Sequence, residues 1–220
     1  MSKLVLNKPV LIMLYGFPGA GKTYLARQLC DDVQIAHVQE ERIRQELFED
    51  PRFDQQENQI VNHLMNYMTT EFLQAGVSVV YDTNLMRVSQ RREIRQLAKQ
   101  NKAETLLVWI QIDHASAFSR ANKRDRRRTD DKYTPSIDEN RFNNIVKHMQ
   151  NPELSEDNIV VSGKHNYSTQ RNTILKKMFD MGLSMPSNDN SKVVKPGLVN
   201  LIPNYNNGRV DASRRNINVR

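Results

Sequence analysis

The sequence predicts an α/β domain in which a parallel five-stranded sheet is flanked by helices. Three observations support this fold class. Short apolar runs alternate with amphipathic segments between residues 10 and 180, as expected for parallel strands joined by helical crossovers. A glycine-rich loop directly follows the first apolar run. The chain of 220 residues is long enough for one such domain with a substantial core.

The expected strands are short apolar runs. The run at residues 10–15 has no polar or charged residue apart from its final tyrosine, which predicts a strand buried on both faces. In chain order the five runs cover residues 10–15, 33–38, 77–81, 105–112 and 158–162. Right-handed crossovers between parallel strands bring their carboxyl ends to one edge, so we expect ligands at that edge.

Helical segments follow each of these runs. Their expected bounds are residues 23–30, 40–48, 54–75, 88–99, 115–128, 136–149 and 169–181. In the longest segment one buried stripe is expected from Ile60, Val61, Leu64, Met65, Met68, Phe72 and Leu73. Gly76 fits the C-terminal cap of this helix, and Pro51 ends the helix before it. Residues 136–139 (Ser-Ile-Asp-Glu) resemble a capping box.

Residues 184–220 differ in composition from residues 1–183. They are rich in Asn, Ser, Lys and Arg, which predicts a basic, largely disordered tail suited to an acidic partner. Six basic residues and one acidic residue between positions 191 and 220 contribute +5 of the net charge of +7. The remaining +2 is carried by residues 1–190 and gives no strong nucleic-acid footprint on the predicted domain at residues 1–183.

The composition also predicts a location. The single cysteine, Cys30, excludes an internal disulfide framework and fits a reducing compartment. No apolar run approaches the roughly 18 residues that a membrane span requires. The five histidines have no cysteine partner at zinc-ligand spacing. We therefore expect a cytoplasmic protein with no membrane partner.

Residues 16–23 read Gly-Phe-Pro-Gly-Ala-Gly-Lys-Thr, a complete G-x-x-x-x-G-K-[ST] phosphate loop. Glycines let the backbone curl so that its N–H groups face phosphate oxygens, and the following helix adds partial positive charge. Lys22 is expected to contact the β- and γ-phosphates, and Thr23 to bind Mg²⁺. The residues expected to contact ATP are Gly16, Pro18, Gly19, Ala20, Gly21, Lys22, Thr23 and Tyr24.

Polar residues follow two further predicted strands. Asp82 could hold the hydration shell of Mg²⁺, with Asn84 beside it, although turn chemistry is the alternative for both. Glu41 opens the helix after the second strand and could accept a proton from an attacking hydroxyl. Arg44, one turn later, could clamp the substrate. A solvated charged helix is the alternative for Glu41 and Arg44.

Residues 120–128 carry six cations and one carboxylate. Arg120 and Arg124 are spaced i, i+4 on the predicted helix and would share a face. Arginines of this kind neutralise charge on a transferring phosphoryl group. A solvated helix is the alternative, but closely spaced like charges repel unless an anion is present. The polar residues 129–134 would suit a lid over the nucleotide.

The order of these motifs resembles the polynucleotide-kinase-like branch of the P-loop kinases, AAA-type ATP-binding proteins related to phage polynucleotide kinase and zeta toxins. The resemblance covers residues 10–163. It rests on the phosphate loop, on Glu-Arg-Ile-Arg at 41–44, on Val-Val-Tyr-Asp-Thr-Asn-Leu at 79–85 and on Arg-Ala-Asn-Lys-Arg at 120–124. It implies a P-loop kinase fold with an Arg-rich lid. It also implies transfer of the γ-phosphoryl group of ATP to a hydroxyl, with Mg²⁺.

Carried over by position, the resemblance assigns catalytic roles to Lys22, Glu41, Arg44, Arg120 and Arg124. The last two resemble lid arginines that also contact ATP. Asp82 would lie near the metal with Thr23, and Asn84 near the acceptor with Glu41 and Arg44. The chain departs from the family pattern at the general base, which is usually Asp in an Asp-x-x-Arg motif and is Glu41 here.

Two classes of function stay open at this point. The first is a kinase that acts on a nucleic-acid 5′-hydroxyl or on a small molecule. The second is a nucleotide-dependent binding or regulatory protein without efficient phosphotransfer. The change from Asp to Glu41 and the basic tail keep the second class open.

Overall fold

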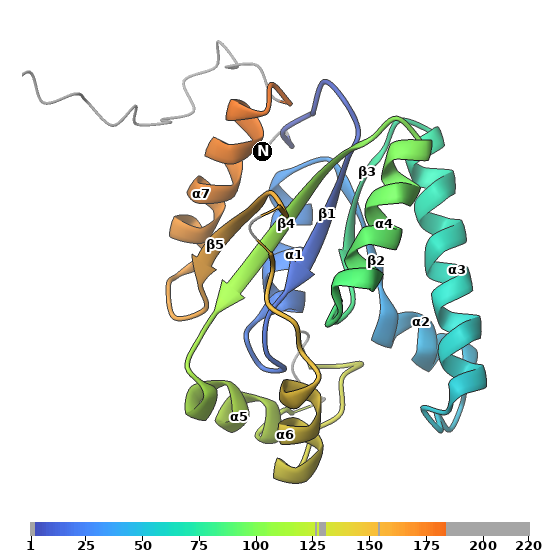
Figure 1. Cartoon of the computed structure of the whole chain (residues 1–220), viewed down its shortest axis with the longest axis vertical. Helices are drawn as coiled ribbons and strands as arrows, with labels where there is room; N and C mark the ends of the chain where they lie inside the picture. The colour runs from blue at the N-terminus through green and yellow to red at the C-terminus, as the bar shows by residue number, and fades with distance from the viewer. Residues whose placement is uncertain (1–2, 126, 128–130, 154, 184–220) are drawn as a thin grey trace, which may run out of the picture. The chain divides into compact units, whose positions relative to one another are not determined.

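The computed structural model describes residues 3–125, 127, 131–153 and 155–183. Within these residues five strands alternate with seven helices (Figure 1). The strands are β1 (Val10–Tyr15), β2 (Ile35–Gln39), β3 (Ser78–Asp82), β4 (Glu104–Gln111) and β5 (Asn158–Ser162). The helices are α1 (Lys22–Asp32), α2 (Glu40–Leu47), α3 (Gln55–Gln74), α4 (Val88–Gln100), α5 (His114–Asn122), α6 (Glu139–Lys147) and α7 (Tyr167–Asp180). The predicted tail at 184–220 lies outside the described residues, as do residues 129–130 of the predicted lid.

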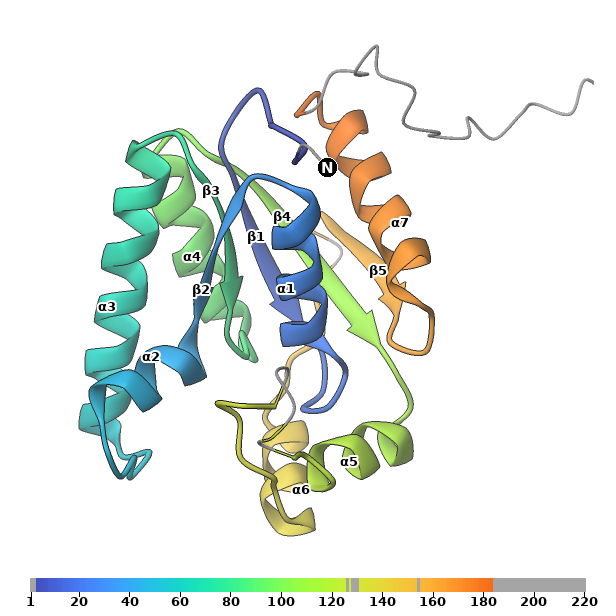
Figure 2. The ribbon, with the colours of Figure 1, turned by 180° about the vertical axis from the view of Figure 1, so that it is seen from behind.

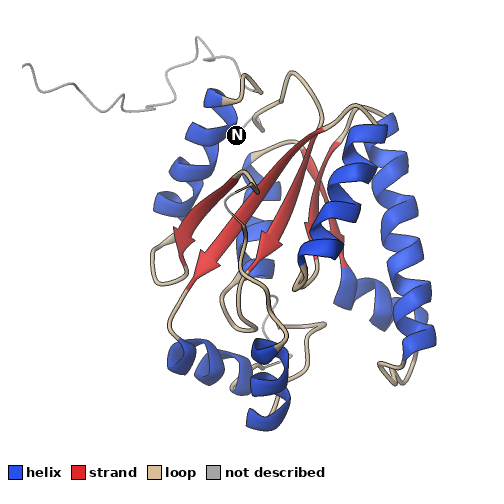
Figure 3. Ribbon diagram, viewed as in Figure 1, coloured by secondary structure: helices blue, strands red, loops and turns tan. Residues whose placement is uncertain are grey.

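The five strands form one parallel sheet in the order β2-β3-β1-β4-β5 (Figure 3). The predicted fold class is therefore confirmed. β1 lies in the middle, where Ile12 is in register with Val80 of β3 and Leu106 of β4. The chain builds one half of the sheet from β1 to β3 and then crosses to the other half. The loop after β1 thus opens where the strand order reverses, which is where such sheets bind ligands.

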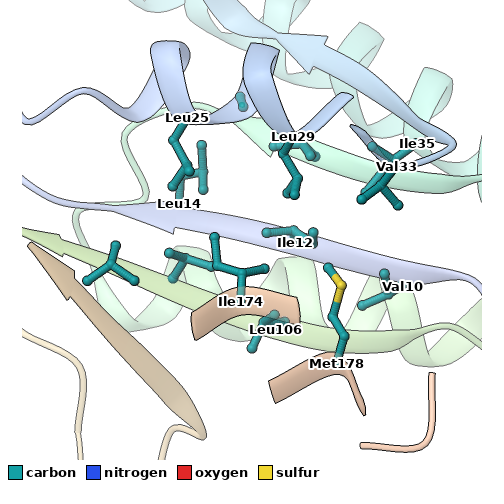
Figure 4. Packing of buried hydrophobic residues seen from close by; sticks show 14 of the residues in the cluster. Val10, Ile12, Leu14, Leu25, Leu29, Val33, Ile35, Leu106, Ile174 and Met178 are labelled. Atoms are coloured by element: carbon teal, nitrogen blue, oxygen red, sulfur yellow. The ribbon is translucent and has the colours of Figure 1, made fainter. Parts of the chain in front are cut away.

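Helices cover both faces of the sheet (Figure 1 and Figure 2). Because successive side chains of a strand point to opposite faces, β1 contributes to two cores. Ile12 packs with Leu29 of α1 and Ile174 of α7 on one face (Figure 4). Met13 packs with Met65 of α3 on the other face, where α4 also lies. The sheet is therefore held rigidly, and its carboxyl edge is a fixed base for a site.

Helices α5 and α6 lie beyond the carboxyl edge of the sheet (Figure 1) and form a small apolar cluster of their own. Ile137 and Phe142 of this cluster flank the start of α6 and form a hydrophobic staple across it. The N-cap is Asp138, whose carboxylate accepts a hydrogen bond from the backbone N–H of Arg141. The predicted capping box at 136–139 is therefore wrong, because the staple places the cap at Asp138.

Two further predictions about helices are wrong. α5 ends at Asn122, so Arg124 lies beyond the helix and does not share a helical face with Arg120. Like charges three and four residues apart destabilise a helix, and the basic run begins where α5 stops. In α3, Ile60 is 44% exposed, whereas the buried face includes Glu57. Glu57 is buried because Arg44 and two backbone N–H groups bind its carboxylate.

Candidate active site

A cavity of about 1080 Å³ opens at the carboxyl edge of the sheet. Its walls come from the loop after β1, the starts of α2, α3 and α6, the end of β3, the end of α5 and the turn after β5. The predicted site residues all line this cavity except Gly16, which lies at the base of the phosphate loop. Predicted residues from four separate segments of the sequence are thus brought to one place.

The phosphate loop has the conformation that its glycines permit. Gly19 and Gly21 have φ angles of 82° and 100°, in the left-handed region that favours glycine. Gly21 is the N-cap of α1, and no described side chain caps this helix end. The first N–H groups of α1 are therefore free to bind an anion.

Lys22 folds back over the loop. Its Nζ atom donates to the carbonyl oxygens of Gly16, at 2.8 Å, and Phe17, at 3.1 Å. Burial lowers the pKa of Lys22 to about 8, although the Asp82 carboxylate raises it in part. A bound phosphate would therefore provide the negative charge that keeps this buried ammonium protonated.

Thr23 and Asp82 supply the oxygen donors that Mg²⁺ prefers. Thr23 lies in the first turn of α1, and Asp82 ends β3 on the same cavity. Asp82 is buried, and its Oδ2 atom lies 3.0 Å from Nε2 of His37, which holds the carboxylate in place. In the described part of the chain no group of three or more His, Cys, Asp or Glu side chains could bind a metal alone. The oxygens of Thr23 and Asp82 therefore fit a Mg²⁺ ion that nucleotide phosphates also bind.

Glu41 lies in the first turn of α2 and lines the same cavity. Burial, followed by the neighbouring Glu40 carboxylate, raises the pKa of Glu41 to about 7, against the opposing effect of three arginines. Its Oε2 atom is buried and has no hydrogen-bond partner among the described residues. A carboxylate in this state is available to accept a proton near neutral pH.

Arg44 is held by other residues of the protein. Only 1% exposed, its guanidinium donates to Glu40 at 2.9 Å, to Asn58 at 2.8 Å and to Glu57 at 3.3 Å. It also lies 4.9 Å from the centroid of the Phe53 ring. These contacts join α2 to α3. The role of Arg44 as a substrate clamp stays a prediction, because most of its donors already have acceptors within the protein.

The other predicted residues contact the protein less extensively. Arg120 donates to the carbonyl oxygen of Gly163 at 2.9 Å, and Arg124 to that of Pro135 at 2.9 Å. Neither arginine forms an ion pair with a carboxylate of the described residues, and burial lowers the pKa of Arg124. The Oδ1 atom of Asn84 is buried without a hydrogen-bond partner among those residues. These groups are free to meet a ligand.

Gly163, Phe53 and Arg141 are among the cavity-wall residues that the sequence-based prediction did not assign to the site. Gly163 packs so closely on the phosphate loop that a Cβ atom there would lie 2.8 Å from the carbonyl oxygen of Ala20. A glycine directly after a strand often marks such a close approach, so this signal was readable. Phe53 and Arg141 meet across the cavity, with the guanidinium 5.1 Å from the ring centroid. Phe53 follows the Glu-Arg-Ile-Arg segment closely in the sequence, but no local pattern indicated that it meets Arg141.

The fold and the phosphate loop define a P-loop nucleotide-binding protein with the fold of P-loop kinases. The particular family follows from comparison with known proteins: the chain belongs to the AAA domain family, whose model matches residues 11–152. A comparison with curated proteins found no match. None of the helices in the described ranges is long and apolar enough to cross a membrane.

Several solved structures share this fold. Kti12 from Chaetomium thermophilum, in complex with ADP-AlF3, is 15% identical with a TM-score of 0.59, covering 77% of this chain and 97% of that one. The APS kinase of Mycobacterium tuberculosis, in complex with AMPPNP and APS, is 13% identical with a TM-score of 0.55, over 78% and 98%. A gluconokinase from Sinorhizobium meliloti 1021 is 11% identical with a TM-score of 0.55, over 79% and 93%. At these identities the likeness establishes the fold alone.

Proposed function

We propose that this protein is an ATP-dependent kinase that transfers the γ-phosphoryl group to a hydroxyl of its acceptor. We place it in the polynucleotide-kinase-like branch of the P-loop kinases. The observation that carries the proposal is the state of Glu41. One of its carboxylate oxygens is buried without a hydrogen-bond partner among the described residues, and the residue lines the same cavity as the phosphate loop. A general base is most effective when its pKa lies near the working pH, and the pKa of Glu41 is about 7.

The proposed reaction gives each of these groups one role. The loop N–H groups and protonated Lys22 hold the β- and γ-phosphates, and the acceptor hydroxyl lies at Glu41. The hydroxyl oxygen forms a bond to the γ-phosphorus as the bond to the β–γ bridging oxygen breaks. The proton passes to the Glu41 carboxylate, and ADP leaves. Arg120 and Arg124 offset the negative charge of the transferring group.

Thr23 and Asp82 would hold Mg²⁺ together with the nucleotide phosphates. When bound, the ion neutralises charge on the β- and γ-phosphates. Asn84 lies one residue beyond Thr83, whose hydroxyl donates to Glu40, so the end of β3 and the start of α2 are tied together. Asp82 and Glu41 are therefore held at a fixed position relative to each other, as in-line transfer requires.

The similar structures support a nucleotide and one type of acceptor, and the sequence resemblance supports a second type. Kti12 was solved with ADP-AlF3 and APS kinase with AMPPNP, which supports ATP as the nucleotide of this chain. Gluconokinase and APS kinase act on small molecules, whereas the resemblance to polynucleotide kinase suggests a 5′-hydroxyl of nucleic acid. Both acceptor types belong in the first assay.

Transfer of label from γ-labelled ATP tests the proposal. The full chain is incubated with Mg²⁺ and either a 5′-hydroxyl oligonucleotide or small hydroxyl compounds such as gluconate and nucleosides. We expect Glu41→Gln to lower kcat about 10²- to 10⁴-fold, the contribution of a general base. Its affinity for ATP should stay within about twofold of the wild type, because the loop is untouched.

Glu46→Gln is the matched control, since Glu46 is exposed on the same helix and does not line the cavity. Lys22→Ala should abolish nucleotide binding and provides the blank. The proposal of a kinase is refuted if no acceptor is labelled although ATP binds tightly, and if Glu41→Gln changes no measured property. The protein is then a nucleotide-dependent binding or regulatory protein.

A further inference from the structure

An arginine at the acceptor end of the cavity has no carboxylate partner among the described residues. Arg141 lies in the first turn of α6 and lines the cavity with Glu41 and Arg124. Its guanidinium makes a cation–π contact with Phe53 but no ion pair within the described part of the chain. Five N–H groups of a fixed planar fork are therefore available to an acceptor molecule.

Phe53 is a rigid support for this guanidinium. Its φ angle is 58°, in the left-handed region that non-glycine residues rarely adopt. The backbone N–H groups of Arg52 and Phe53 each donate to the Glu57 carboxylate at 2.7 Å, and Glu57 is itself buried. Arg44 also packs on the Phe53 ring. The ring is thus fixed from the α2–α3 side, and it orients Arg141, which reaches it from α6.

The surroundings of Arg141 favour an anion. Of the nearby carboxylates, Glu40 is paired with Arg44. Asp131 and Glu41 offset the charge of Arg124, and Glu41 also interacts with the charge of Arg141. Arg124 and Arg141 both line the cavity, and burial and then the positive charge of Arg141 lower the pKa of Arg124, the direction expected for repulsion between two guanidiniums. An anion between them would relieve this repulsion, because each guanidinium matches an oxyanion in shape and charge.

Neutral hydrogen-bonding groups complete this end of the cavity. Asn58, Asn62, Asn84 and Gln90 line it, and the Oδ1 atom of Asn84 is buried without a partner in the described residues. Amides of this kind bind hydroxyl groups without adding charge. The wall therefore offers cationic donors on the α6 side and neutral partners on the side of β3 and α3.

We propose that Arg141 selects an acceptor that carries an oxyanion, either a phosphate or a carboxylate, in addition to its reacting hydroxyl. The oxyanion lies against Arg141 on its Phe53 support, and the hydroxyl lies at Glu41. This inference rests on the proposed function, since it assigns the acceptor end of the same cavity. It makes Arg141 a specificity-determining residue outside the motifs of the phosphate loop, β3 and the basic run.

Anion binding to the nucleotide-loaded protein is the first test. The full chain is saturated with AMPPNP and Mg²⁺, which occupies the phosphate loop, and is then titrated calorimetrically with inorganic phosphate or with acetate. Arg141→Gln should weaken binding of at least one anion by about 10-fold or more, the loss expected for a charged hydrogen-bonding partner. Arg92→Gln, on the exposed face of α4, should leave it unchanged. Equal binding by wild type and Arg141→Gln, or no saturable binding by wild type, overturns the inference.

Arg141→Lys guards against a folding artefact, because it keeps the charge but loses the planar fork. Its anion affinity should lie between those of the wild type and Arg141→Gln. The melting temperature and AMPPNP affinity of each variant show whether the fold and the phosphate loop are intact. A variant with both intact and anion affinity equal to that of the wild type counts against the inference.

Matched acceptors distinguish phosphate from carboxylate. Adenosine 3′-monophosphate and adenosine share a 5′-hydroxyl, and gluconate and glucose share a primary hydroxyl. The wild type should prefer one anionic member over its neutral counterpart in kcat/KM, and Arg141→Gln should reduce that preference about 10-fold or more. Transfer without any such preference refutes the inference about Arg141 but leaves the proposed kinase function supported. Arg141-dependent anion binding without transfer to any acceptor refutes the kinase and supports the anion site.

Discussion

Replacing Gly19 with alanine tests the contact between the phosphate loop and α5. Gly19 has a φ angle of 82°, and a Cβ atom there would lie 2.2 Å from the carbonyl oxygen of Ala117 and 2.9 Å from the backbone nitrogen of Ala121. The shorter distance is at least 1.2 Å below ordinary van der Waals contact, which begins at 3.4 Å. Both neighbours are backbone atoms that cannot rotate away. The loop or α5 must therefore shift by about that distance.

Gly76→Ala separates backbone strain from this collision. Gly76 has a φ angle of 76° with nothing within 4 Å of an added Cβ atom, and it lies outside the cavity. The left-handed conformation alone costs about 1–2 kcal/mol in either variant. We expect Gly76→Ala to lose that much free energy of unfolding and to keep its ATP affinity. In Gly19→Ala, kcat/KM should also fall about 100-fold, the effect of a 1 Å misplacement of reacting groups.

Urea unfolding measures the free energy of unfolding of both variants. Titration with ATP measures their nucleotide affinity, and transfer from γ-labelled ATP measures kcat/KM. If Gly19→Ala binds ATP within about threefold of Gly76→Ala, a difference of roughly 0.7 kcal/mol, the close packing of the loop on α5 is not needed for nucleotide binding. The reasoning from steric contact would then be refuted.

Two further predictions follow from titratable groups. The pH profile of kcat/KM should be bell-shaped, because Glu41 must be ionised and Lys22 protonated. The rising limb should lie near pH 7 and the falling limb near pH 8. Steady-state kinetics that show a single limb would contradict these roles. Glu156→Gln should lower the free energy of unfolding at pH 7 by about 3 kcal/mol in urea. Burial raises the pKa of Glu156, but hydrogen bonds from Arg91 and Arg95 outweigh it and hold the pKa at about 2. Because the folded pKa is the lower one, this stabilisation is lost as the pH falls from about 4 towards 2, and an unchanged stability at pH 7 would contradict it.

Much of the fold was accessible from local patterns. A strand buried on both faces needs apolar side chains throughout, so residues 10–15 could be recognised without knowledge of their neighbours. Helix ends were less predictable. α5 stops at Asn122 where cations accumulate, and α6 starts at Asp138 because Ile137 and Phe142 pack across its first turn. Packing decided the start of α6, whereas the end of α5 follows from repulsion between like charges in the basic run.

The candidate site divides in the same way. The phosphate loop is contiguous, so its residue types and spacing alone predict a loop that curls around an anion. Asp82 and Glu41 could be proposed because both follow strands, and the carboxyl ends of parallel strands share an edge. The burial that raises the pKa of Glu41 was invisible to the sequence, because it depends on every element that closes the cavity.

By itself, the sequence determined the fold class, the phosphate loop and the edge of the sheet at which a ligand is expected. These properties depend on residues that are adjacent along the chain or repeat with the period of a strand or helix. Only the tertiary structure decided that Arg44 is held by Glu57 of α3 and that Phe53 meets Arg141 of α6. Contacts between distant segments arise when the sheet and its helices pack together, and no local pattern encodes them.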